Sequence, residues 1–168
     1  GQCERSPAVQ VSLLRDLIDI RGALLAAHKE IPAAVQSAID RMAPMLRLFR
    51  LGDGALAVFN GGQEESPEHV DIALARADAR GKPLDQAPLA GFERLASGRT
   101  VVVVDAGPPP EGAFGRNAHA GTLGFEMSSG RDRVVVGCGM MAGASAEWRR
   151  ALRSTPAHST LALGDADS

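Results

Sequence analysis

The spacing of the apolar residues changes near residue 50, and this change constrains the fold more than any other feature of the sequence. Before it, apolar side chains recur at helical spacing, as in Val35, Ile39, Met42 and Leu46. After residue 90, short apolar runs are separated by turn sequences, which is typical of β-strands. Helices followed by strands predict an α+β fold. We expect a helical domain over residues 1–50 and a β-domain over residues 51–168.

The helical part reads as an antiparallel hairpin of two helices. Ser6 and Pro7 form a favourable start for the first helix, because a capping hydroxyl precedes a proline in the first turn. The Ile31-Pro32 pair ends this run and opens the second helix. Pro44 should kink that helix, since proline lacks the N–H that the helix interior needs. A further short helix is expected from Ser66-Pro67 to about residue 79.

The β part contains about six predicted strands, at residues 55–59, 91–96, 99–105, 122–128, 132–138 and 157–163. Ser97-Gly98 and the residues 129–131 provide two hairpin turns. A helical turn is expected over residues 147–152. A β-sandwich needs about seven strands or more, so we expect a partial antiparallel β-sandwich. Glu126 should face solvent, because it alternates with the apolar residues Phe125 and Met127.

The charges exclude two classes of partner. The 18 basic and 20 acidic residues are interspersed and give a net charge of −2. Without a block of one sign, the chain has no surface for nucleic acid or for an anionic membrane. The apolar runs, such as residues 101–104, are far shorter than a membrane span. Because the chain begins at Gly1 without methionine, we expect it to be an internal piece of a longer protein.

Two histidines and a cysteine are predicted to meet at one edge of the sheet. His119 precedes a hairpin, Cys138 ends its returning strand, and His158 opens the following strand. Imidazole nitrogen and thiolate sulfur are ligands that Zn²⁺ accepts, so these residues could form a zinc site. The alternative is structural: a histidine at a strand end commonly caps a turn, and a cysteine in a strand commonly packs as a small apolar residue.

Three sequence motifs, in this order, resemble those of the heparinase II/III-like polysaccharide lyases of bacteria. They are Asn117-Ala118-His119-Ala120-Gly121-Thr122-Leu123-Gly124-Phe125, Arg133-Val134-Val135-Val136-Gly137-Cys138-Gly139 and Arg153-Ser154-Thr155-Pro156-Ala157-His158-Ser159-Thr160. The segment over residues 41–47 is similar to the closing helices of that family's α/α toroid. The resemblance implies that residues 1–50 end a toroid and that residues 51–168 begin the β-sandwich. It leaves the compartment open between bacterial periplasm and cytoplasm.

The resemblance also implies roles for individual positions. Asn117 stands where relatives have a histidine that reaches the substrate cleft, and His119 follows in the cleft motif. His119 and His158 match two ligands of a metal buried in the sandwich of some relatives. The third, acidic ligand falls at Gly137, which has no side chain. Cys138 comes next along the chain, but it could replace that ligand only through a bulge or a register shift. Zinc is therefore an expected cofactor with an incomplete ligand set.

The family cleaves uronic-acid-containing glycans by β-elimination, which uses a base and an acid that is usually tyrosine. This chain contains no tyrosine. We therefore expect it to be inactive alone and to need the rest of its parent chain, with an acidic polysaccharide or oligosaccharide as the other partner. A non-catalytic glycan-binding or structural protein of the same architecture is the alternative. A structural domain that is stabilised by a bound metal and has no glycan role is a third possibility.

Trp148 and its neighbour Arg149 are the other candidates for substrate binding. An exposed indole can stack on a sugar ring, and a guanidinium group can pair with a carboxylate. A single tryptophan in a helical turn more commonly packs that turn against a sheet. Both interpretations stay open from the sequence.

Overall fold

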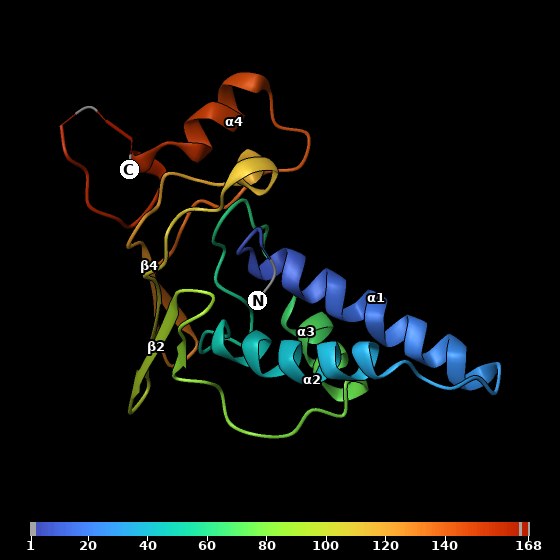
Figure 1. Cartoon of the computed structure of the whole chain (residues 1–168). Coiled ribbons are helices and arrows are strands. Elements are labelled where there is room, and N and C mark those ends of the chain that lie inside the picture. Colours follow the sequence, from blue (N-terminus) through green and yellow to red (C-terminus); the bar gives the residue numbers. More distant parts are fainter. Residues whose placement is uncertain (1–2, 165, 168) are drawn as a thin grey trace.

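The computed structural model describes residues 3–164 and 166–167, and it has the expected α+β architecture. Three helices lie on one side of a sheet (Figure 1): α1 (Pro7–Ala26), α2 (Ala33–Leu48) and α3 (Pro67–Arg76). The sheet has five strands in sequence order, β1 (Gln86–Ala87), β2 (Phe92–Ser97), β3 (Thr100–Asp105), β4 (Phe125–Ser129) and β5 (Asp132–Val135). Each neighbouring pair is antiparallel.

The remaining elements lie beyond the strand ends, together with the C-terminus (Figure 1). They are helix α4 (Ala146–Arg153) and two short 3-10 helices, η1 (Gly112–Asn117) and η2 (Thr155–Ala157). Among the described residues, no helix combines the length and the apolar character needed to cross a membrane.

One buried cluster joins the helices to the sheet. It contains Leu14 of α1, Leu46 of α2, Val70 of α3 and Phe92 of β2, together with residues of the segment between α2 and α3. Phe92 packs edge-on against Phe49, with 4.8 Å between the ring centroids. The core therefore extends across the predicted boundary at residue 50, and the division into two domains stays a prediction.

The segment over residues 50–62 lies buried between the helices and the sheet, and the strand predicted at 55–59 is wrong. Its only strand-like pairing in the described chain is the isolated bridge between Arg50 and Leu56. Its backbone groups bind side chains of the sheet instead of a neighbouring strand. Val58 N–H donates to Glu126 Oε1 (2.8 Å), and Gly52 N–H donates to Ser128 Oγ (2.9 Å). Side-chain oxygens thus accept hydrogen bonds that the backbone carbonyls of a neighbouring strand would accept in a sheet.

The face of the sheet toward the helices carries buried polar groups beside the apolar core residues Phe92 and Val103, which reverses the predicted orientation of β4. Glu126 is only 1% exposed, whereas Phe125 is 37% exposed. On the same inner face, Arg94 donates to the Leu48 carbonyl at the end of α2 (3.0 Å) and Arg133 pairs with Asp53 (2.7 Å). The alternation of polar and apolar residues along a strand assigns them to opposite faces of the sheet, but it does not determine which face is buried. The outer face carries apolar side chains, including Leu95, Val102, Met127 and Val134.

The last predicted strand, at residues 157–163, is also wrong. Residues 155–157 form η2, and the chain then continues through bends with an isolated bridge between Leu163 and Ala166. The segment still runs beside the start of β4. The Phe125 N–H donates to the Ser159 carbonyl (3.3 Å), and the Thr160 hydroxyl donates to the Thr122 carbonyl. Hydroxyl groups thus replace part of the ladder of backbone bonds that a strand would make.

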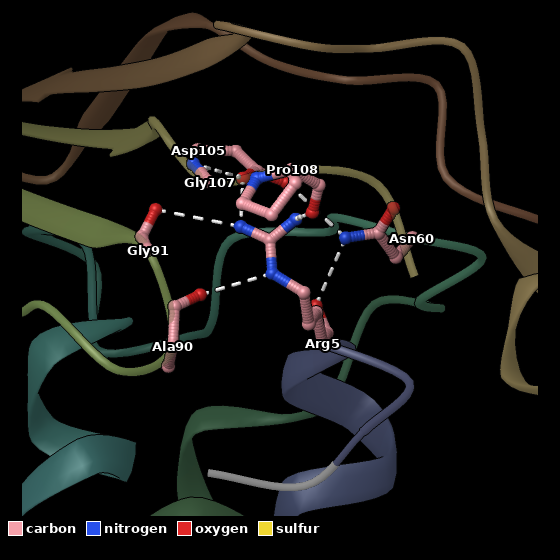
Figure 2. Close-up of polar contacts among 7 residues, drawn as sticks. All are labelled: Arg5, Asn60, Ala90, Gly91, Asp105, Gly107 and Pro108. Carbon is pink, nitrogen blue, oxygen red and sulfur yellow. Dashed lines mark hydrogen bonds and ion pairs between the residues drawn. The ribbon is translucent and has the colours of Figure 1, made fainter. Parts of the chain in front are cut away.

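Arg5 fixes the start of α1 to the sheet (Figure 2). Its guanidinium group pairs with the Asp105 carboxylate and donates to backbone carbonyls of two loops, those of Ala90 (2.9 Å), Gly91 (3.4 Å) and Pro108. The Asn60 amide donates to the Arg5 carbonyl (3.0 Å) and to Asp105 Oδ2 (3.2 Å). The Arg5 group also lies 4.8 Å from the centre of the Phe92 ring. The start of α1, the segment over residues 50–62 (the central segment) and the sheet therefore meet at one polar contact.

Candidate functional site

A small internal cavity lies between the central segment, the start of β4 and the loop that contains His158. Its volume is about 20 Å³, and His119, Glu126, Gly137 and His158 line it. Asn60 and Asp105 of the Arg5 network border the same cavity. The site predicted from the histidines is therefore in the interior of the molecule, and it shares Asn60 and Asp105 with the polar contact shown in Figure 2.

His119 follows η1 and is held in place by the last residue of α4. The Ala120 N–H donates to the Arg153 carbonyl (2.8 Å), and Arg153 Nε donates to the Ala118 carbonyl (3.0 Å). The His119 side chain is only 7% exposed. Gly61 makes this packing possible, because a Cβ there would lie 2.8 Å from the Asn117 carbonyl oxygen and 3.5 Å from His119 Nε2.

The two predicted histidines lie together. The centroids of the His119 and His158 rings are 5.1 Å apart, with 51° between the ring planes. Burial is the main cause that lowers the pKa of His119 to about 4, and the neighbouring His158 and Arg153 lower it further. Burial also lowers the pKa of His158, against the opposing effect of its hydrogen bond to the backbone of Leu152. Both rings are therefore neutral near pH 7.

The cavity also contains the carboxyl group of Glu126, which was predicted to face solvent. Glu126 Oε1 accepts a hydrogen bond from the Val58 N–H (2.8 Å), and a backbone hydrogen bond from Gly137 also stabilises the ionised carboxyl group. Burial raises the pKa of Glu126 to about 7, although these two backbone hydrogen bonds lower it. A glutamate in the middle of an otherwise apolar strand is the signal that could have indicated a buried functional group, since unpaired carboxylates are seldom buried.

Four buried side-chain atoms have no hydrogen-bond partner within the described part of the protein. They are His119 Nδ1, His119 Nε2, Glu126 Oε2 and His158 Nε2. All four belong to residues that line the one small cavity. Buried polar groups without a partner are costly and rare in native proteins, so this concentration marks the cavity as the candidate functional site.

The donors do not fit a zinc ion as they are arranged. Cys138 is exposed and lines a different cavity, so the structure brings His119 and His158 together without it. Gly137 borders the cavity but provides no ligand. Across the described residues, no three His, Cys, Asp or Glu side chains form a group that could hold a metal. A zinc site needs three or four converging protein ligands, and zinc binding stays a prediction.

Asn117 does not reach the His119 cavity. It is exposed at the end of η1 and lines a surface cavity of about 370 Å³ beside α1. Glu4, Glu64 and Glu65 border the same surface cavity, and no lysine or arginine does. The two residues of the predicted cleft motif therefore face different surroundings, and those of Asn117 are acidic.

Trp148 lies on the exposed side of α4 and does not pack that helix against the sheet. Its side chain is 59% exposed. It lines a surface cavity of about 620 Å³ together with Arg133, Cys138, Met141 and Leu152. Arg149 is exposed on the same helix but does not line this cavity. The Ser145 side chain caps α4 by accepting the Trp148 N–H (3.2 Å).

The fold and motifs have a clear counterpart among known proteins. Residues 79–168 match the family described as heparinase II/III-like, C-terminal, and this chain belongs to that family. This confirms the family that the three motifs indicated. A curated relative is FtsZ-localized protein C of Caulobacter vibrioides (strain NA1000 / CB15N), which is 38% identical over 165 residues. The match covers 98% of this chain and 28% of that protein, so the chain spans little more than a quarter of its relative.

Two solved structures share the fold at low sequence identity. A heparinase III gene product has a TM-score of 0.79 and 18% identity, and a heparan sulfate lyase HepC mutant from Pedobacter heparinus has a TM-score of 0.78 and 21% identity. Each match covers 99% of this chain and 30% of the other. At these identities the similarity establishes the architecture alone.

Proposed function

We propose that this chain is a non-catalytic part of a longer lyase-type protein, and that the rest of that protein supplies the groups for β-elimination. The observation that carries the proposal is the location of His119. It lines an interior cavity of about 20 Å³, which is far too small for a sugar ring, and although it also borders a surface cavity of about 460 Å³, its side chain is only 7% exposed and offers little surface to a glycan. The chain also has no tyrosine to act as the acid.

The glycan contact of this chain would lie at Trp148. The 620 Å³ surface cavity is large enough for a sugar unit and offers an exposed indole for stacking. Arg133 lines this cavity, and Arg149 follows Trp148 in α4; their positive charge suits an acidic glycan. The cavity at Asn117 is less suitable, because three glutamates and no basic residue line it, whereas Arg133 lies beside the single glutamate, Glu64, of the Trp148 cavity.

A comparison of the full-length polypeptide with the 168-residue chain tests whether catalysis needs the rest of the protein. Heparan sulfate serves as the probe, and the ultraviolet absorbance of an unsaturated uronate product reports cleavage. We expect cleavage by the full-length polypeptide and none by the chain. Cleavage by the isolated chain would overturn the proposal, because it would require a base and an acid within these residues.

A non-catalytic protein of the same architecture is the second candidate, and the curated relative favours it. That relative is named for its localisation with FtsZ and not for a lyase activity. Under this alternative, the full-length polypeptide would bind heparan sulfate or a protein partner without producing unsaturated uronate. Fluorescence imaging of the tagged polypeptide with labelled FtsZ, beside the cleavage assay, separates the two candidates: cleavage supports the first, and co-localisation without cleavage supports the second.

A further inference from the structure

The cavity between His119, His158 and Glu126 is built for a small hydrogen-bonding ligand. It contains every buried side-chain atom of the described residues that has no hydrogen-bond partner. We propose that the cavity binds one water molecule, held by His119, His158 and Glu126, and that Glu126 provides there the carboxyl group that Gly137 cannot provide. The proposal does not depend on any glycan activity.

The volume of the cavity matches a single water molecule. A cavity needs about 10–15 Å³ of accessible volume to hold one water, and the molecule needs two to four polar partners. This cavity has about 20 Å³ and four atoms without a partner. Two water molecules would not fit, and an apolar group would leave the buried nitrogens and the carboxyl oxygen without hydrogen bonds.

The hydrogen-bonding roles of the three side chains are complementary to water. Each neutral imidazole has one donor and one acceptor nitrogen. His158 uses one ring nitrogen on the backbone of Leu152, which leaves Nε2 for the cavity. Glu126 Oε2 accepts a hydrogen bond when the carboxyl group is ionised and can donate one when it is protonated. Because water both donates and accepts, one molecule can bind all three side chains in either state.

The separation of the donors favours water over zinc. Zinc requires nitrogen and oxygen ligands at about 2.0–2.2 Å, so the ligand atoms must converge closely. Water bridges groups through bonds of about 2.7–3.2 Å and tolerates a wider arrangement. No three potential ligands among the described residues converge enough for a metal. Glu126 Oε1 also accepts the Val58 N–H, which keeps the carboxyl group in its position.

Glu126 occupies the space in which a side chain at position 137 would begin. A Cβ placed on Gly137 would lie 3.3 Å from Glu126 Oε1. The carboxyl group in the cavity therefore comes from β4, while position 137, just after β5, has no side chain. An acidic residue at 137 would bring a second carboxyl group close to Glu126 and would raise the pKa of one of the two.

Metal analysis and crystallography of the full-length polypeptide that carries this chain test the proposal. The protein is freed of metal, exposed to one equivalent of zinc and passed over a desalting column, and its zinc content is measured. We expect no retained zinc, no change in Tm on adding zinc or a chelator, and a water peak within hydrogen-bond distance of Glu126 Oε2 and both imidazoles. Retention of one zinc per chain that both His119→Ala and His158→Ala abolish would overturn the proposal.

Two variants of Glu126 give an independent test that does not require crystals. At pH 4.5, where Glu126 is protonated in the folded protein, Glu126→Gln keeps the hydrogen-bonding groups, so we expect its Tm to stay within about 4 °C of the parent, which corresponds to about 1 kcal/mol for a chain of this size. Glu126→Leu has a similar size without polar atoms, and it leaves the Val58 N–H unsatisfied, so its Tm should fall much further. Equal losses in the two variants would contradict a hydrogen-bonding role for Glu126.

Discussion

Arg5 and Asp105 form a buried ion pair between the start of α1 and the end of β3. Their side chains are 10% and 7% exposed. Burial raises the pKa of Asp105, while Arg5, Gly107 and Asn60 act in the opposite direction by stabilising the ionised form. The pair therefore depends on its full set of hydrogen bonds, and losing one member would leave the other charge buried without a partner.

Replacing Arg5 should strongly destabilise the protein. Removal of one member of a buried ion pair costs about 3–5 kcal/mol, and Arg5→Ala also removes the guanidinium donor from Asp105 and from the carbonyls of Ala90, Gly91 and Pro108. Urea unfolding measures the loss. Arg76→Ala is the matched control, because Arg76 and Asp19 form an exposed pair that should contribute no more than about 1 kcal/mol. Similar losses for the two variants would show that Arg5 does not hold α1 to the sheet.

Two glycines should respond in opposite directions to alanine. Gly91 has φ +70, and a Cβ there would overlap the backbone of Gly107, so Gly91→Ala should destabilise by more than about 1 kcal/mol. Gly22 lies inside α1, where a Cβ would have no neighbour within 4 Å. Gly22→Ala should therefore stabilise by about 0.5–1 kcal/mol. Thermal unfolding of the two variants checks both signs. A stabilising Gly91→Ala would refute the close approach of the two loops.

The pH dependence of stability should contain two opposing contributions. Glu126 has a pKa of about 7 in the folded protein against an ordinary value of 4.5, so the folded state binds more protons and stability falls as pH rises from 4.5 to 7. His119 has a pKa of about 4 against 6.5, so the unfolded chain binds more protons and stability rises as pH increases from 4 to 6.5.

Glu126→Gln separates these two contributions. The variant keeps the rising contribution of His119 and loses the falling contribution of Glu126. Its free energy of unfolding should therefore rise more steeply than that of the parent between pH 4.5 and 6.5 and should show no Glu126-linked decrease up to pH 7. Urea unfolding at a series of pH values provides the comparison. Parallel curves for parent and variant would mean that Glu126 titrates in the folded protein as it does in the unfolded chain.

Trp148 should matter for glycan binding and little for folding. Its side chain is 59% exposed, so Trp148→Ala should change the free energy of unfolding by no more than about 0.5 kcal/mol. If the 620 Å³ cavity binds the glycan, the same change should weaken binding of heparan sulfate, measured by calorimetry, about tenfold or more. Leu161→Ala is the control, since Leu161 is 73% exposed and does not line this cavity. Equal affinities of parent and Trp148→Ala would remove Trp148 from the proposed contact.

Local patterns predicted most of the elements of the fold. The helical spacing before residue 50 and the turns at Ser97-Gly98 and residues 129–131 correspond to α1, α2 and the two hairpins β2–β3 and β4–β5. These features depend on neighbours in sequence, such as a proline at a helix start or a glycine with positive φ. The motif order also placed the chain in its family.

The errors arose where distant residues decide the structure. Residues 55–59 have the composition of a strand, but Glu126 binds the backbone of this segment at Val58, and Ser128 binds the backbone of Gly52 just before it, where a neighbouring strand would bind. Glu126 was predicted to face solvent because a polar residue between apolar neighbours usually does. Its burial depends on N–H groups of Val58 and Gly137 that only the folded chain brings near. The spacing of polar and apolar residues in the sequence does not indicate these contacts.

The buried polar groups on the inner face of the sheet restrict how the sheet and the helices can move relative to each other. The bonds of Arg94 to the end of α2 and of Arg133 and Glu126 to residues 50–62 are directional and are satisfied in one alignment. The sheet is therefore held at a set angle to the helices. In a longer protein, any residue carried by the helices would keep a constant position relative to β2, β4 and β5.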